Sequence, residues 1–461
     1  MMKLIKRNEK REINKIDGQL MFSNKFLIKL LWPLFIEQFL VFAVGLVDSI
    51  MVASVGEAAV SAVSLVDSVM VLIITVMTAL ATGGAVVVGQ FLGQSKDGEA
   101  RQAGDQLILF IIMFSVFIIA VMYAFKNFIL SVVFGNIEED VMAYCNTYYI
   151  IVVASVPFIA VYNAGAALFR SVGNSQMSMK ISFLMNGINV AGNAMLIYGF
   201  NRGVEGVAIP TLVSRVVAAF IVFRCLKNQE FEMHISRRFV YRPDWKLIKN
   251  ILKIGVPNGV ENSMFQLGKL ILLSMISGFG TAAIAANAVG NAVAMIAVLP
   301  GMSVGYGIVS VISRCVGSGD YNQVRYYTKK LMKWVYYLMI AVNVIIIFLT
   351  PFILKIYGLS ETTADIAGKI IIFHSFWAIT IWPLSFSLPN MLRAAGDVMY
   401  TMIIGVGSMW IFRICFGIVL GLAMGFGVFG VWIAMIIDWA IRAICFIIRY
   451  RSGRWKHPAV E

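Results

Sequence analysis

The stretch GVEGVAI at Gly203–Ile209 returns as GVFGVWI at Gly427–Ile433, 224 residues further along the chain. The same offset places Pro33 on Pro257 without a gap. Landmarks this far apart that keep a single offset indicate that one unit has been duplicated. The repeat therefore decides the fold, because the second half must build again what the first half builds.

The composition places this repeated unit in a lipid bilayer. Of the 461 residues, 60% are hydrophobic and 13% are charged, and the mean hydropathy is +0.84, whereas globular chains are about 45–50% apolar and about 25% charged. A helix needs about 20 apolar residues to cross the hydrocarbon, and the short alternating strands of a β-barrel are not seen. Such segments are expected near 27–53, 60–92, 103–126, 144–169, 179–200, 203–226, 251–277, 284–313, 331–356, 368–392, 401–425 and 427–448. We therefore predict an all-α polytopic membrane protein with twelve transmembrane helices.

Each copy of the repeat contains six spans, so both copies enter the bilayer from the same side. Two six-helix bundles related by a pseudo-twofold axis along the membrane normal are the expected arrangement. Most of the 38 lysines and arginines flank the segments that lie inside if the N-terminus is cytoplasmic. We expect both termini on the cytoplasmic side of the plasma (inner) membrane. The expected parts are a cytoplasmic N-terminal arm (1–26), an N-lobe (27–226), a cytoplasmic interlobe linker (227–250), a C-lobe (251–448) and a cytoplasmic tail (449–461).

Missing motifs exclude several classes of function. The five cysteines and three histidines are scattered without the spacing of a metal site, and the chain has no phosphate-binding loop for ATP. Neither a paired His/acid metal motif nor a nucleophile elbow suggests an enzyme. The net charge of +14 is explained by membrane orientation, so nucleic-acid binding is the weaker interpretation. We expect a transporter driven by ion exchange, with no cofactor besides the coupling ion.

Several motifs together resemble a known family. They are VDSIMVASVG at Val47–Gly56, the pair FRSVGN at Phe169–Asn174 and LRAAGD at Leu392–Asp397, and the two GVxGV stretches that open spans six and twelve. In this order and duplication, they resemble the multidrug and toxic compound extrusion (MATE) family over residues 27–450. The resemblance implies an antiporter that expels amphipathic, often cationic compounds in exchange for inward Na⁺ or H⁺.

Acids inside the bilayer are the candidates for ion coupling, because each costs at least about 2.5–3.5 kcal/mol to insert. The resemblance matches Asp48 to the family's first-span aspartate, and Asp67 begins span two at a similar depth. Two carboxylates at one level could share a proton or a cation such as Na⁺, for which oxygen ligands are suitable. By the same resemblance, Asn189 and Asn193 line this site, although ordinary interhelical hydrogen bonds explain each asparagine about as well. Span four adds Asn163 and Tyr162 as weaker members. Beyond Na⁺ at Asp48, no metal is expected.

Glu37 and Glu261 are equivalent acids of the two repeats. Glu37 precedes Asp48 by eleven residues, which places it on the same helix face about 16 Å deeper. Facing a cavity from opposite lobes, the two acids would attract a cationic drug. Each also follows a helix proline by one turn, so a structural role at a bend competes on equal terms.

The substrate cavity is expected among polar and aromatic side chains of the spans that would bound it. The candidates are Asn262, Gln266, Lys269, Phe42, Met264, Phe265, Tyr306, Trp377 and Trp382. Such rings attract organic cations, but the same residue types are also common on lipid-facing surfaces.

Asp438 and Arg442 are four residues apart on span twelve, with Arg413 at a similar depth on span eleven. Complementary charges at this spacing favour a structural ion pair.

The leading hypothesis is a multidrug efflux antiporter of the plasma membrane that works by alternating access. Its partners would be organic cations and the lipid bilayer, and a monomer suffices because one chain holds both lobes. A flippase of lipid-linked glycan on a related fold is the alternative. A membrane-embedded enzyme or a passive channel is less well supported by the sequence.

Overall fold

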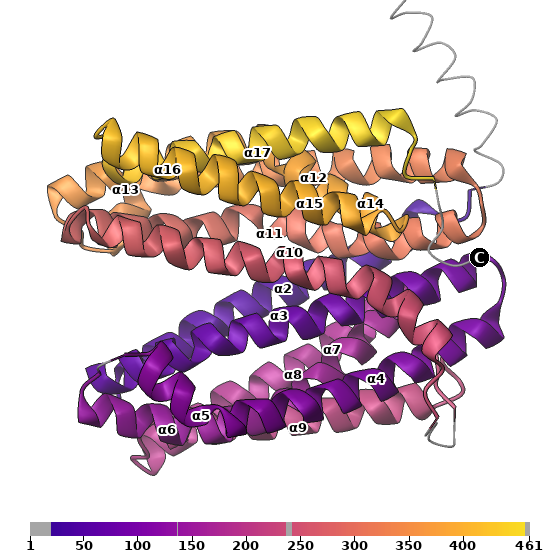
Figure 1. Ribbon diagram of the computed structural model, residues 1–461, viewed down its shortest axis with the longest axis horizontal. Helices are drawn as coiled ribbons and strands as arrows, with labels where there is room; N and C mark the ends of the chain where they lie inside the picture. Colours follow the sequence, from indigo (N-terminus) through magenta and orange to yellow (C-terminus); the bar gives the residue numbers. More distant parts are fainter. Residues whose placement is uncertain (1–19, 136, 237–241, 457–461) are drawn as a thin grey trace, which may run out of the picture. The chain divides into compact units, whose positions relative to one another are not determined.

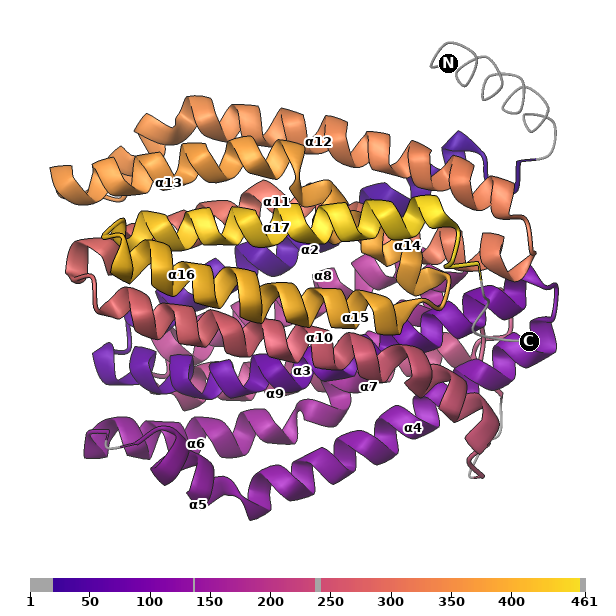
Figure 2. The same cartoon turned by 45° about the horizontal axis from the view of Figure 1, so that its top comes forward.

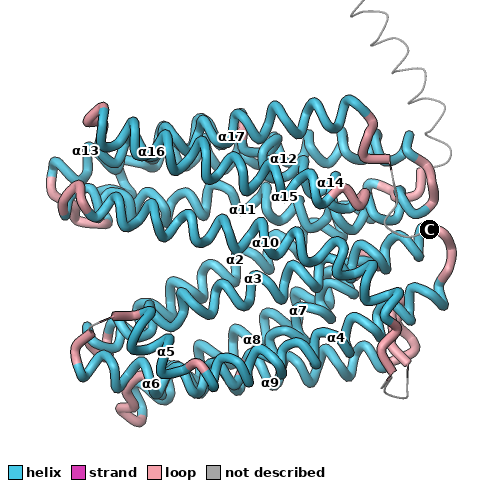
Figure 3. The backbone as a smooth tube through the Cα atoms, in the orientation of Figure 1, coloured by secondary structure: helices cyan, strands magenta, loops and turns pink. Residues whose placement is uncertain are grey.

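The computed structural model describes residues 20–135, 137–236 and 242–456. Most of the expected N-terminal arm, the linker residues 237–241 and the last five residues of the tail lie outside the described residues. Every regular element in the described part is a helix, as Figure 3 shows, so the predicted all-α fold class is confirmed.

The long helices follow the two halves of the repeat (Figure 1). Those of the first half are α2 (Asn24–Ala53), α3 (Glu57–Gly93), α4 (Asp97–Ala124), α6 (Glu139–Ala154), α7 (Val156–Ser171), α8 (Ser175–Ala194) and α9 (Glu205–Lys227). Those of the second half are α10 (Trp245–Ser277), α11 (Thr281–Gly317), α12 (Tyr321–Ile356), α13 (Glu361–Thr380), α14 (Leu388–Ala394), α15 (Val398–Ser408) and α17 (Gly427–Ser452). Short helices and π-helical turns fill the breaks: α5 (Lys126–Phe128), η1 (Ile129–Val133), η2 (Met195–Gly199), η3 (Pro383–Ser387), η4 (Met409–Cys415), α16 (Phe416–Ile418) and η5 (Val419–Ala423).

The repeat is kept to single residues in the structure. Helices α3 and α11 are both 37 residues long, and their first and last residues are each 224 positions apart. The π-helical turns η2 and η5 are separated by the same offset. In FRSVGN and LRAAGD, Gly173 and Gly396 have φ angles of +85° and +90°. Only glycine adopts this conformation without strain, so the repeated motif codes for the same turn between two helices.

The expected spans differ in how regular they are. Among the described residues, nine helices are long and apolar enough to cross a membrane, and two bent pairs raise this to eleven. The pair α6 and α7 bends by 42°, and α13 and α14 bend by 58°. Both breaks carry a proline at the start of the next element, Pro157 and Pro383, because proline removes a helix hydrogen bond. Helix α10 has the length of a span, with 33 residues, but it is the most polar of the twelve segments.

The helices form two compact units. The first, here called the N-unit, contains Pro33–Val88 and Asp97–Gln266, and the second, the C-unit, contains residues 20–32, Gly89–Lys96 and residues 267–456. Helices α2, α3 and α10 each contribute segments to both units.

Each unit has a central helix. In the N-unit, α9 contacts α6, α7 and α8, and in the C-unit, α11 contacts α12, α13 and α14. Figure 2 shows α12 and α13 side by side in the C-unit, which agrees with their extensive contact. Close approach depends on small residues: a Cβ at Gly83 of α3 would lie 2.7 Å from the carbonyl oxygen of Ile251 on α10. This packing fixes the helices that carry the polar clusters described next.

Candidate functional site

The N-unit holds a polar cluster around Asp48, near the end of α2. Asn193 of α8 is fully buried, and its Nδ2 donates a 2.8 Å hydrogen bond to Asp48 Oδ1. Asn189 lies one turn earlier on the same face of α8. With its amide oriented to satisfy both neighbours, its nitrogen lies 3.0 and 3.1 Å from the Asp48 oxygens, and its oxygen accepts from Thr211 Oγ1. The structure thus brings together three of the predicted coupling residues.

Asp67 of α3 joins this cluster from another side. Tyr148 of α6 donates a 3.1 Å hydrogen bond to Asp67 Oδ1. Asp67 also lies close enough to Asp48 for the two charges to repel each other. Arg215 of α9 donates to Ser155 Oγ at 2.7 Å and attracts both carboxylates electrostatically.

Tyr148, Thr211 and Arg215 are not among the predicted site residues. The sequence held one signal for them, since Arg215 is a base inside the bilayer in the half that contains two intramembrane acids. Tyr148 and Thr211 carried no signal, because a tyrosine or threonine in a transmembrane helix is ordinary.

The cluster has the chemistry of a small-cation site. Its two carboxylates and one guanidinium leave one net negative charge. Asn193 Oδ1 is buried and has no hydrogen-bond partner among the described residues. Carboxylate and amide oxygens are hard ligands that suit Na⁺, and a carboxylate alone can take a proton. In the described part of the chain, no group of three or more His, Cys, Asp or Glu residues could hold a transition metal.

Glu37 forms a separate cluster in the N-unit, deeper along α2. Its carboxylate is buried and accepts hydrogen bonds from Ser178 Oγ at 2.8 Å, Tyr162 Oη at 3.4 Å and Arg170 Nη1 at 3.4 Å. The last contact is also an ion pair. Tyr162 is therefore grouped with Glu37 rather than with Asp48, and Asn163 Nδ2 donates to Thr78 Oγ1 at 3.2 Å.

The expected cavity residues lie on several helices. Glu261 of α10 is buried, Asn262 Nδ2 donates to Asn258 Oδ1 at 3.2 Å, and Lys269 is exposed. In the C-unit, Trp382 is buried and stacks on Phe386 with ring centroids 5.2 Å apart. Partly buried side chains make up the rest: Phe42, Met264, Phe265, Gln266, Tyr306 and Trp377. Their role in a cavity stays a prediction.

The C-unit holds the other charged cluster. Arg413 Nη1 of η4 lies 3.8 Å from Asp438 Oδ2 of α17, and Asp438 is completely buried. The guanidinium of Arg442 lies 4.7 Å from the centre of the Phe386 ring. These are the three residues for which a structural ion pair is predicted.

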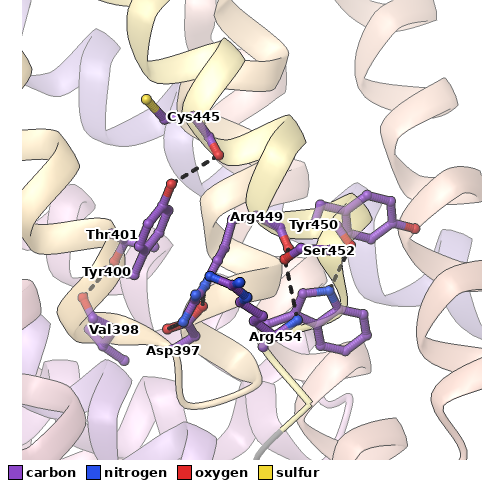
Figure 4. Close-up of polar contacts among 10 residues, drawn as sticks. Asp397, Val398, Tyr400, Thr401, Cys445, Arg449, Tyr450, Ser452 and Arg454 are labelled. Atoms are coloured by element: carbon purple, nitrogen blue, oxygen red, sulfur yellow. Dashed lines mark hydrogen bonds and ion pairs between the residues drawn. The ribbon is translucent and has the colours of Figure 1, made fainter.

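The repeated motif LRAAGD ends in a further ion pair of the C-unit. Figure 4 shows Arg449 beside Asp397 and Tyr400. Arg449 Nε and Nη2 donate to the two Asp397 oxygens at 2.6 and 3.0 Å, and the guanidinium lies 4.6 Å from the centre of the Tyr400 ring. This contact ties the start of α15 to the last turns of α17.

Comparisons with known proteins place both halves of the chain in one family model. The MatE model matches residues 33–195 and again residues 257–419. The uncharacterized transporter YisQ of Bacillus subtilis (strain 168) is 27% identical over 93% of this chain and 94% of its own length. The probable multidrug resistance protein NorM of Thermotoga maritima is 26% identical over 95% of this chain and 94% of its own length.

Solved structures share the fold. One described as the outward-facing conformation of a multidrug resistance MATE family transporter of the MOP superfamily has a TM-score of 0.88 at 20% identity. It covers 94% of this chain and 96% of its own. A crystal structure of MATE in the bent conformation has a TM-score of 0.85 at 20% identity, with the same coverage.

Proposed function

Because this chain belongs to the MatE family, as the resemblance in its sequence predicts, we propose that it is a secondary active multidrug efflux antiporter. It exports amphipathic, cationic compounds in exchange for inward Na⁺ or H⁺ by alternating access. Members of this family are transporters and not enzymes. The observation that supports ion coupling most directly is the N-unit cluster, in which Asp48 and Asp67 face buried amide groups inside a membrane-spanning bundle.

The coupling cycle uses the charge of this cluster. In the empty state, Asn189 and Asn193 hold the Asp48 carboxylate, and repulsion from Asp67 makes a positive guest favourable. A cation or proton bound there removes the net negative charge, which favours one of the two access states. A cationic drug favours the other state, so the ion and the drug exchange across the membrane. Tyr148 and Arg215 position Asp67 and balance the pair.

The setting of this cycle follows from the charge pattern of the sequence. We place the protein in the plasma membrane with both termini in the cytoplasm, because lysine and arginine are retained on that side. The N-lobe and C-lobe act as the two moving bodies, and one chain is sufficient as a monomer.

The alternative of a lipid-linked glycan flippase is not favoured. A phosphate-bearing substrate requires a cationic site, whereas the coupling cluster carries net negative charge. The relatives with an assigned role, such as NorM of Thermotoga maritima, are described as multidrug resistance proteins.

The test uses purified protein in liposomes, with Na⁺ and pH gradients imposed separately while ethidium efflux is followed. Wild-type protein should respond to at least one gradient, and Asp48→Asn should reduce that response at least tenfold because it removes the site's charge. Asp365→Asn makes the same chemical change at an exposed position of α13 and should leave efflux unchanged. Undiminished gradient-driven efflux in Asp48→Asn would contradict the proposal.

A further inference from the structure

The charged cluster of the C-unit is richer in bases than in acids. Arg413 and Arg442 act on each other electrostatically, and Lys269 of α10 acts on Arg413. Asp438, 3.8 Å from Arg413, is the acid recorded as acting on this group in the described part of the chain. Three bases and one acid give the cluster a net charge of +2 within membrane-spanning helices. A charge of this kind is expensive in a bilayer, and an anion would offset it.

Two buried polar groups in the cluster lack the hydrogen bonds that a finished structural network provides. Both oxygens of Asp438 are buried without a hydrogen-bond partner in the described structure, and the 3.8 Å separation from Arg413 is an ion pair but too long for a hydrogen bond. Trp439 is 3% exposed, and its Nε1 hydrogen has no acceptor among the described residues. Purely structural buried ion pairs are normally satisfied on all sides, because an unsatisfied buried group is costly.

The repeat gives this cluster a defined relation to the cation site. Arg413 occupies the position that Asn189 occupies 224 residues earlier, and Trp439 occupies the position of Arg215. The equivalent of Asp48 is Leu272. The place that holds an acid and amides in the N-unit therefore holds a guanidinium and no acid in the C-unit, so the polarity of the site is reversed.

We propose that the C-unit cluster is a binding site for an organic carboxylate, with Asp438 as a loosely seated internal counter-ion that the ligand replaces beside Arg413. A guanidinium binds a carboxylate in a planar, bidentate geometry. The Trp439 Nε1 hydrogen is a further donor, and the rings of Phe386, Trp432 and Trp439 surround the cluster with aromatic surface. Lys269 is exposed and gives the cluster an accessible edge. The ligand is a compound with an aromatic or aliphatic body and one carboxylate.

This site goes beyond the proposed antiport function, because it needs neither Asp48 nor an ion gradient. Its test is equilibrium binding of radiolabelled benzoate to the full-length protein in detergent, at constant Na⁺ and ionic strength maintained with methanesulfonate. Asp48→Asn should bind benzoate as the wild type does, so a failure of the coupling proposal leaves this result unaffected.

Three substitutions make the test specific. Lys269→Gln should weaken benzoate binding about tenfold, since a hydrogen bond to a charged group is worth about 1.5–3 kcal/mol, and its exposed position makes a folding defect avoidable. Lys369→Gln removes the same charge from an exposed site on α13 and should have no effect. Asp438→Asn should tighten benzoate binding severalfold, because it removes the internal competitor. A purely structural ion pair predicts no such gain.

The outcomes separate clearly. Benzoate binding that weakens in Lys269→Gln and strengthens in Asp438→Asn supports the site. Binding that is absent in the wild type, or equal in all four proteins, would overturn it. Chloride that competes as tightly as benzoate itself binds would overturn the assignment to a carboxylate.

Discussion

Replacing Ser178 by alanine tests whether Glu37 is held as part of the N-unit scaffold. Ser178 Oγ donates to Glu37 Oε2 at 2.8 Å, while the other two donors, on Tyr162 and Arg170, lie at 3.4 Å. Ser178 therefore makes the shortest of the three bonds to a carboxylate that is only 4% exposed. Its loss leaves one oxygen of a buried charge without its donor.

The magnitude follows from the kind of bond that is lost. A hydrogen bond to a charged group is worth about 1.5–3 kcal/mol, and the upper part of that range applies when the charge is buried. We expect Ser178→Ala to lower the free energy of unfolding by about 2 kcal/mol. Ser115→Ala is the matched control, because Ser115 is equally buried but donates only to the Ile112 carbonyl of its own helix α4, at 2.9 Å. A neutral bond of this kind is worth about 0.5–1.5 kcal/mol.

The assay is denaturant unfolding of the full-length protein in detergent micelles, arranged as a double-mutant cycle with Glu37→Gln. If Ser178 stabilises the protein through the Glu37 charge, its substitution should cost at least about 1 kcal/mol less in the Glu37→Gln background. An equal cost in both backgrounds would show that Ser178 acts through something other than Glu37 and would refute the reasoning.

Two further changes test helix packing and the C-unit ion pair. Gly83→Ala should destabilise the protein by about 1–3 kcal/mol in the same unfolding assay, because its Cβ would lie 2.8 Å from the backbone nitrogen of Gly255. Gly187→Ala, which meets nothing within 4 Å, should not. Arg449→Gln should lower the midpoint of thermal unfolding, at a cost of about 1–3 kcal/mol for the two charged hydrogen bonds to Asp397; an unchanged midpoint would show that this ion pair does not stabilise the C-unit.

The duplicated architecture could be predicted from the sequence because it depends on features that a repeat preserves. The equal lengths of α3 and α11 and the common offset of η2 and η5 follow from the alignment of the two halves. The bends between α6 and α7 and between α13 and α14 could not be placed in the same way. A transmembrane proline shows where a helix can bend, but the angle depends on the helices packed against it.

The coupling site was only partly predictable, for a similar reason. Asp48, Asn189 and Asn193 stand out because acids and amides are costly in lipid, and a four-residue spacing places the two asparagines on one face of α8. Tyr148 and Thr211 gain their role only from tertiary packing, since they come from α6 and α9 and make no pattern of their own in the sequence. Tyr162 shows the opposite error, because its helix was expected near Asp48 but its hydroxyl reaches Glu37.

Duplication of the backbone without duplication of its charges bears directly on mechanism. The offset that superimposes α3 on α11 also pairs Asp67 with Asn291 and Asp48 with Leu272, so an acidic coupling site can exist only in the first copy. A symmetrical pair of cation sites is therefore excluded by the sequence itself. The second copy retains the same helices but has a guanidinium at the position of Asn189, and a bundle with such a charge must find its counter-ion elsewhere. A cation-coupled half and a base-rich half within one duplicated fold give each repeat a different part in transport.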